Sequence, residues 1–151
     1  MRTLITTLVL ALAAILPSAA QSALNSNADS IVGDYYIVQN GDESKVRFSK
    51  NADGTYKCQI FWLKNDKDAN GNKYLDTKNP DKSLRSTPSD RIVLINGLKY
   101  NAEKKQWDGA RIYDPQRGIK AAVTASFLDD KTLRIRGSVM GIGETVYWKK
   151  L

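Results

Sequence analysis

Histidine is absent from this 151-residue sequence, and cysteine occurs once, at Cys58. Without histidine there is no Ser-His-Asp or Cys-His relay and no zinc site built on imidazole. One cysteine cannot close an internal disulfide bond or form a thiolate cage around a metal. We expect Cys58 to be a buried, inert thiol, because it shares a strand face with Tyr56 and Ile60. The sequence therefore predicts a protein that is not an enzyme and needs no cofactor, with a hydrolase as the remaining catalytic alternative.

A concentrated patch of one charge is also lacking. Lys and Arg number 23 against 16 Asp and Glu, which gives a net charge of +7, and the two signs are mixed along the chain. Such mixing is typical of a solvated surface. We therefore expect no nucleic-acid partner.

Long hydrophobic runs are missing except at the N-terminus. Residues 4–16 form a 13-residue apolar run broken only by Thr6 and Thr7, whereas a membrane-spanning helix needs about 20. Small residues follow Pro17, as at the cleavage site of a signal peptide. We therefore expect an exported protein, periplasmic or secreted, without stable membrane insertion. Its expected organisation is a signal peptide at 1–20, a flexible N-terminal segment at 21–30 and one domain at 31–151.

The rest of the chain consists of short apolar segments separated by turn residues. Within several segments apolar and polar residues alternate with a period of two, which is typical of half-buried strands. Eight such strands joined by short turns can close into an antiparallel barrel without exposed edges; a β-sandwich is the alternative. A long polar loop at 65–90 separates the third strand from the fourth. The expected strands are 31–39, 45–48, 55–64, 91–95, 107–113, 119–128, 132–139 and 144–150.

Two motifs are specific in both order and spacing. Residues 76–81 read Asp-Thr-Lys-Asn-Pro-Asp, and residues 112–115 read Ile-Tyr-Asp-Pro. With Trp107-Asp108-Gly109 and Trp148, they resemble the bacterial family known as domain of unknown function 2147, over about residues 33 to 149. The resemblance implies a small exported protein with a lipocalin-like barrel, and it bears on fold and compartment rather than on chemistry.

The start of the first expected strand departs from the family pattern. The family has Gly-x-Trp where this chain has Gly33-Asp34-Tyr35. We hypothesise that Arg136 lies over the Tyr35 ring and closes one end of the barrel, as in lipocalin-like folds. An anion site for a fatty-acid-like carboxylate and a solvent-exposed cation are the alternatives for Arg136.

An eight-stranded barrel is just wide enough to be filled by its own side chains or to hold one small ligand. We expect a binding module for a small apolar or amphipathic molecule. The alternative is an envelope interaction module with a filled barrel, acting through residues 65–90 and 113–118. The expected ligand-binding residues are Tyr35, Phe48, Ile60, Trp62, Val123, Phe127 and Arg136.

Polar residues are concentrated in the two motifs at 76–81 and 112–115 and in the residues that follow the first of them. They are candidates for a rim that hydrogen-bonds a ligand. Alternatively they hold the long loop in place, because Asp and Asn side chains accept from backbone N–H groups; Asp81 is expected to cap a helical turn there. The residues are Asp76, Asn79, Asp81, Arg85, Tyr113 and Asp114.

Residues 66–71 match the first half of a calcium-binding loop, with Asp66, Asp68 and Asn70 as oxygen ligands. The twelfth position of such a loop must supply a bidentate carboxylate, and here it is Thr77. The segment is therefore a weak calcium candidate, and an ordinary polar hairpin tip is the alternative. No other metal site is expected.

Overall fold

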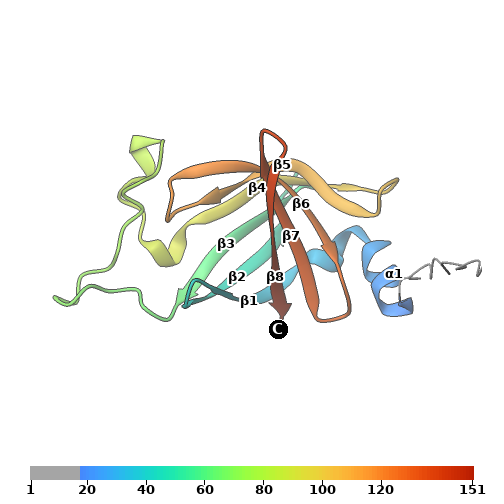
Figure 1. Ribbon diagram of the computed structural model, residues 1–151, viewed down its shortest axis with the longest axis horizontal. Helices are drawn as coiled ribbons and strands as arrows, with labels where there is room; N and C mark the ends of the chain where they lie inside the picture. Colours follow the sequence, from blue (N-terminus) through green and yellow to red (C-terminus); the bar gives the residue numbers. More distant parts are fainter. Residues whose placement is uncertain (1–17) are drawn as a thin grey trace, which may run out of the picture.

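The computed structural model describes residues 18–151. They form a closed barrel in which each of eight strands pairs antiparallel with the next, and β8 pairs with β1 (Figure 1). The predicted all-β, eight-stranded antiparallel barrel is thus confirmed. The strands are β1 (Gly33–Gln39), β2 (Asp42–Lys50), β3 (Tyr56–Leu63), β4 (Val93–Asn101), β5 (Gln106–Asp114), β6 (Ile119–Phe127), β7 (Thr132–Val139) and β8 (Ile142–Lys150); the short helices are α1 (Ala19–Asn25), η1 (Ala28–Ile31), η2 (Lys82–Leu84) and η3 (Ser89–Arg91).

Alternation of side chains along the strands places the core. In β7, Leu133 and Ile135 are buried, whereas Arg134 and Arg136 are exposed. Because successive side chains of a strand point to opposite faces, the apolar residues Leu133 and Ile135 lie inside the barrel and the two arginines outside. Where the alternation is regular, it therefore indicates which residues face the interior.

Bulges interrupt this alternation at two glycines. Gly97 in β4 and Gly109 in β5 both adopt a φ of +78°, and the register shifts beside each of them. A β-bulge adds one residue to one strand and bends it. This explains why β4 continues to Asn101, although the sequence predicted that the strand stops at residue 95, before Asn96 and Gly97.

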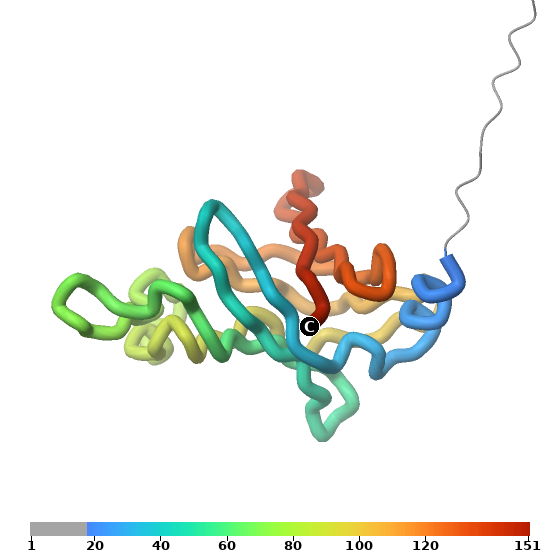
Figure 2. The backbone as a smooth tube through the Cα atoms, turned by 90° about the horizontal axis from the view of Figure 1, so that it is seen from below, coloured from blue at the N-terminus to red at the C-terminus, as the bar shows by residue number. Residues whose placement is uncertain are grey.

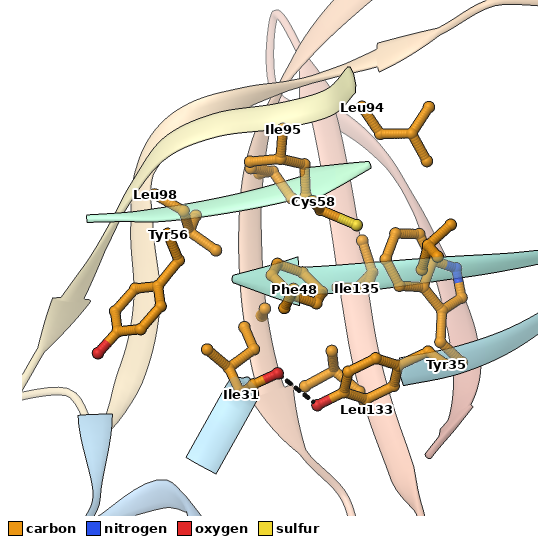
Figure 3. Close-up of a cluster of buried hydrophobic side chains, with 14 of the residues drawn as sticks. Ile31, Tyr35, Phe48, Tyr56, Cys58, Leu94, Ile95, Leu98, Leu133 and Ile135 are labelled. Atoms are coloured by element: carbon orange, nitrogen blue, oxygen red, sulfur yellow. Dashed lines mark hydrogen bonds between the residues drawn. The ribbon is translucent and has the colours of Figure 1, made fainter. Parts of the chain in front are cut away.

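Aromatic side chains fill one end of the barrel, which we call the closed end. Tyr35 and Phe48 meet edge to face with ring centroids 5.6 Å apart. The Tyr35 hydroxyl donates to the Ile31 carbonyl at 2.8 Å, so the end of η1 is fixed to β1 (Figure 3). Trp107 and Phe127 form a second edge-to-face pair at 5.8 Å. This end of the interior is therefore packed solid.

The N-terminal helices cover the closed end. The Trp107 indole donates to the Ala28 carbonyl at 2.9 Å, and the Tyr100 hydroxyl donates to the Asn25 carbonyl at 2.7 Å. The sequence predicted a flexible segment at 21–30; in the structure these residues form α1 and η1 and are bonded to β4 and β5. The predicted signal peptide falls mostly on residues 1–17, which lie outside the described residues.

Residues 64–92 connect β3 to β4 at the opposite end from α1 (Figures 1 and 2). This segment contains η2 and η3, and an isolated bridge joins Leu75 to Pro88. The Asp76 N–H donates to the Thr87 carbonyl at 2.9 Å, so the segment folds back on itself. Within residues 18–151, no helix has the length and apolar character that crossing a membrane requires.

Candidate functional site

A cavity of about 1140 Å³ occupies the half of the barrel that faces residues 64–92. We call this end the mouth; it is bordered by the β1–β2, β5–β6 and β7–β8 turns and by residues 64–92. Every strand except β2 contributes an apolar residue to the wall. In each of these strands, inward-facing positions in this half of the barrel are apolar. Examples are Ile37, Ile60, Leu94, Ile112, Ile135 and Val146.

The barrel wall is not hydrogen-bonded along its full height. β1 and β8 pair only at Tyr35–Lys150 and Tyr36–Lys149, close to the closed end. Toward the mouth the β1–β2 and β7–β8 hairpins diverge (Figure 2). Ile37 of β1 and Val146 of β8 both line the cavity beyond the last pair. The unpaired edges of the two strands therefore border the cavity on this side.

A buried polar network lies in the wall near the mouth. Asp76 and Tyr113 both line the cavity and are 3% and 4% exposed. The Tyr113 hydroxyl donates to Asp76 Oδ1 at 2.7 Å, and the Asn79 amide donates to Asp76 Oδ2 at 2.8 Å. Burial, and secondly the bond to Asp76, raises the pKa of Tyr113 well above its ordinary value. The phenol therefore stays protonated and remains a donor at neutral pH.

The β5–β6 turn is tethered to three other parts of the mouth. The Gln116 amide donates to Asp42, the first residue of β2, at 3.0 Å. Arg117 contacts Glu144 of β8 at 3.4 Å, and Lys78 of the long segment donates to the Gln116 carbonyl at 2.7 Å. Side chains therefore link opposite sides of the barrel across the mouth.

The predicted ligand-binding residues separate into three groups. Ile60 lines the cavity as expected. Four others are buried but belong to the core rather than to the cavity wall: Tyr35, Phe48, Val123 and Phe127. The large aromatics among them fill the closed end.

Trp62 and Arg136 point away from the cavity. The register shifts between Lys45 and Val46, so that Ile60 faces Val46 but Trp62 faces Lys45. This bulge reverses the alternation expected from Ile60: Trp62 is 37% exposed under the Lys45 ammonium, and Leu63 lines the cavity instead. Arg136 is exposed, with its guanidinium against Thr145 Oγ1 at 3.5 Å.

Lys150, rather than Arg136, lies over Tyr35. Its ammonium is 5.9 Å from the Tyr35 ring centroid and 5.0 Å from that of Phe127. The hypothesis of Arg136 over Tyr35 is therefore wrong. The alternation of side chains along β7 and β8 predicts the observed arrangement. Arg136 is on the face opposite Ile135, whereas Lys150 shares the inward face with Trp148.

The predicted rim residues lie together in the structure. Asp76, Tyr113 and Asp114 line the cavity, and Asn79 is buried beside Asp76. Two others hold the loop: Asp81 caps η2 by accepting from the Ser83 N–H at 2.9 Å, as expected, and Arg85 donates to the Asn79 carbonyl at 2.8 Å.

The calcium candidate is a hairpin tip. Asp68 Oδ1 accepts from the N–H groups of Asn70 and Asn72, both at 2.9 Å. Asp66 lies 3.5 Å from the Lys73 ammonium. Among residues 18–151, no three His, Cys, Asp or Glu side chains are grouped so that they could hold a metal ion.

Several residues of the site were not predicted from the sequence. Trp148 lines the cavity and is 3% exposed, and the structure gives its buried indole N–H no hydrogen-bond partner. Alternation from Val146 would have identified it. The contact between Asp42 and Gln116 joins residues 74 positions apart, and nothing in the local sequence pattern indicates it.

Comparison with known proteins agrees with this architecture. One similar solved structure is protein HP1028 from the human pathogen Helicobacter pylori, which is described as belonging to the lipocalin family. It superposes on this chain with a TM-score of 0.63 at 23% sequence identity, and the match covers 80% of this chain and 82% of that chain. This likeness shows that the barrel is lipocalin-like. Among curated proteins, no match was found. The family model described as an uncharacterized protein conserved in bacteria (DUF2147) matches residues 33–150, and the chain therefore belongs to this family.

Proposed function

We propose that the protein is an exported, non-enzymatic binding protein that holds one small apolar or amphipathic molecule in the barrel. The observation that carries this proposal is the cavity of about 1140 Å³ with its aliphatic wall. Ligand sites in proteins are concave, mostly apolar spaces of about 300–1,000 Å³. The cavity is thus large enough for a ligand with a long hydrocarbon part.

The alternative is a barrel filled by its own side chains. Only the closed end of this barrel is filled in that way. Small residues keep the other half open: Gly137 and Ala121 both face the cavity, and a Cβ built on Gly137 would lie 3.5 Å from the Ala121 Cβ. A barrel that used only its outer surface would have no need of this empty volume. The open half therefore favours ligand binding.

A role without catalysis is supported by the chemistry of the site. The sequence has no histidine. Cys58 is buried, and burial raises its thiol pKa well above the ordinary value, whereas a nucleophilic cysteine needs a lowered pKa. Asp76 accepts hydrogen bonds from Tyr113 and Asn79, so it acts as a structural acceptor. These groups suit binding and positioning.

Export is proposed from the apolar run at residues 4–16 and the small residues after Pro17. An exported carrier would meet apolar molecules that are poorly soluble in water. A periplasmic or secreted location is therefore part of the proposal. Detection of the protein in periplasmic and culture fractions of its host, with N-terminal sequencing of the mature chain, tests it.

Binding is tested by titrating the purified protein with N-phenyl-1-naphthylamine, a neutral dye whose fluorescence rises in apolar surroundings. We expect saturable binding at one site per chain. Gly137→Leu adds a side chain inside the cavity and is expected to weaken binding by at least about tenfold, or about 1.4 kcal/mol. Ser138→Leu adds the same side chain on the outer face and is the control. Equal affinities of the two variants, or no saturable binding by the unmodified protein, would contradict the proposal.

A further inference from the structure

We propose that the cavity selects an amphiphile with a neutral or cationic head group, such as an alkylammonium, over one with a carboxylate. The inference rests on the proposed function, because it concerns the ligand of the same cavity. It follows from where the charged side chains of the wall lie and from which of them are buried.

The only buried charged residue that the structure places in the cavity wall is an acid, Asp76. Its two hydrogen-bond donors, Tyr113 and Asn79, are neutral. No salt bridge within residues 18–151 includes Asp76. The wall therefore presents a carboxyl group without a cationic partner from the protein.

The cations of the wall are exposed, and two of them are already engaged. Arg117 pairs with Asp114 at 2.6 Å and lies 3.4 Å from Glu144, and Lys78 donates to a backbone carbonyl at 2.7 Å. In all, the wall has five acids and three bases; Lys64, outside the wall, pairs with one of the acids, Glu43, so an excess of one acid remains in a chain whose net charge is +7. The acids are Asp42, Glu43, Asp76, Asp114 and Glu144; the bases are Lys67, Lys78 and Arg117.

The two arginines of β7 do not change this balance. Arg136, the candidate for binding a carboxylate, is on the outer face against Thr145. Arg134 is also exposed and donates to Ser126 at 3.1 Å. A carboxylate held at the mouth would thus lose hydration without gaining a buried cation.

Burial determines the size of this preference. Charges interact more strongly at low effective dielectric than in water, and buried groups are screened less by salt. A carboxylate drawn into the wall region would be repelled by Asp76, whereas an ammonium would be attracted and an alcohol would be nearly indifferent. The head-group order is therefore ammonium first, alcohol second and carboxylate last.

The test compares decylammonium, decanol and decanoate, which share the same hydrocarbon chain, as competitors that displace N-phenyl-1-naphthylamine at neutral pH. For the unmodified protein we expect decylammonium to bind at least about threefold more tightly than decanoate, the size of a weak charge interaction. The preference should persist at high salt, since it depends on a buried group. Decanoate binding as tightly as decylammonium overturns the inference and leaves the proposed function intact; displacement by none of the three overturns both.

Asp76→Asn removes the buried charge and is expected to reduce the preference for decylammonium to near unity. Asp130→Asn makes the same change in an exposed residue of the β6–β7 turn at the closed end, and is expected to leave the preference unchanged. Equal effects of the two substitutions would count against Asp76 and overturn the inference. If Asp76→Asn does not fold, the ranking of the three competitors on the unmodified protein decides alone.

Discussion

The ammonium group of Lys150 lies 5.0 Å from the centre of the Phe127 ring. Lys150 is the last residue of β8, and it also donates to the Ser30 carbonyl at 2.7 Å. The end of the chain therefore contacts both the aromatic core and the segment that leads into β1. Lys150 is half-buried, and the loss of hydration on burial lowers its pKa.

Lys150→Met keeps most of the side chain but removes the charge and the donor. We expect a loss of about 1 kcal/mol in the free energy of unfolding, because a cation–π contact contributes about 0.5–1 kcal/mol. The hydrogen bond to Ser30 is also lost. Part of that loss is offset, because methionine has no charge that must give up hydration on burial. Urea denaturation measures the change. Lys149→Met, on the exposed neighbour, is the matched control and should have almost no effect; similar losses in both variants would refute a special role for Lys150.

Asn25 connects the N-terminal segment to β6. Its amide donates to the Phe127 carbonyl at 2.9 Å, and its oxygen accepts from the Phe127 N–H at 2.7 Å. Asn25→Asp replaces the donor by an oxygen that faces a carbonyl, so we expect it to cost about 2 kcal/mol, similar to Asn25→Ala. Asn27→Asp is the control, since either residue can accept from the Asp29 N–H at the start of η1. Thermal melting compares the variants, and an unaffected Asn25→Asp melt would show that the segment does not stabilise the barrel.

At Gly118 the β5–β6 turn packs against the backbone of the long segment. It has a φ of +66°, and a Cβ there would lie 2.4 Å from the Lys78 carbonyl oxygen. Gly118→Ala must therefore displace the segment as well as adopt a strained backbone. Gly71→Ala shares the strain, at a φ of +81°, but has open space around it.

The left-handed conformation costs a residue with a Cβ about 1–2 kcal/mol, and both alanine variants bear this cost. We expect Gly118→Ala to lose at least about 1 kcal/mol more in urea denaturation, as overpacking typically costs 1–3 kcal/mol. It should also raise proteolysis within residues 64–92. Equal stabilities of the two variants would mean that the contact with Lys78 contributes nothing.

The barrel could be predicted from the sequence because it depends on local patterns. Several strands alternate with a period of two and turn residues separate successive strands, so strand positions such as 132–139 agreed with the structure to the residue. Those patterns carry no information about contacts between distant residues. The bonds from Gln116 to Asp42 and from Trp107 to Ala28 join residues that are distant in the sequence and depend on closure of the barrel.

The cavity residues were predicted less well, for two physical reasons. A bulge of one residue before Trp62 reverses which face each later side chain takes, and nothing in the residues 60–63 distinguishes it from regular alternation. The aromatic residues Phe48 and Phe127 were also predicted to bind the ligand, whereas they fill the closed end. The small residues Ala121 and Gly137 line the cavity and leave room in it.

Tyr113→Phe tests the buried polar network directly. It leaves Asp76 Oδ1 without its donor, and an unpaired buried acceptor costs about 1–3 kcal/mol, so we expect a loss in that range at neutral pH. Tyr147→Phe removes the hydroxyl of a tyrosine that is 57% exposed and should have little effect. Urea denaturation of both variants gives the comparison.

The same phenol should also make stability fall at alkaline pH. Burial raises the pKa values of Tyr35, Tyr56 and Tyr113 in the folded protein, so above the ordinary tyrosine pKa of about 10 the unfolded chain loses protons that the folded chain keeps. The free energy of unfolding therefore has its full value below about pH 10 and declines above it. Tyr113→Phe removes one of the three groups and should make that decline shallower than in the Tyr147→Phe variant. Parallel declines in the two variants would show that Tyr113 ionises as easily in the folded protein as in the unfolded chain.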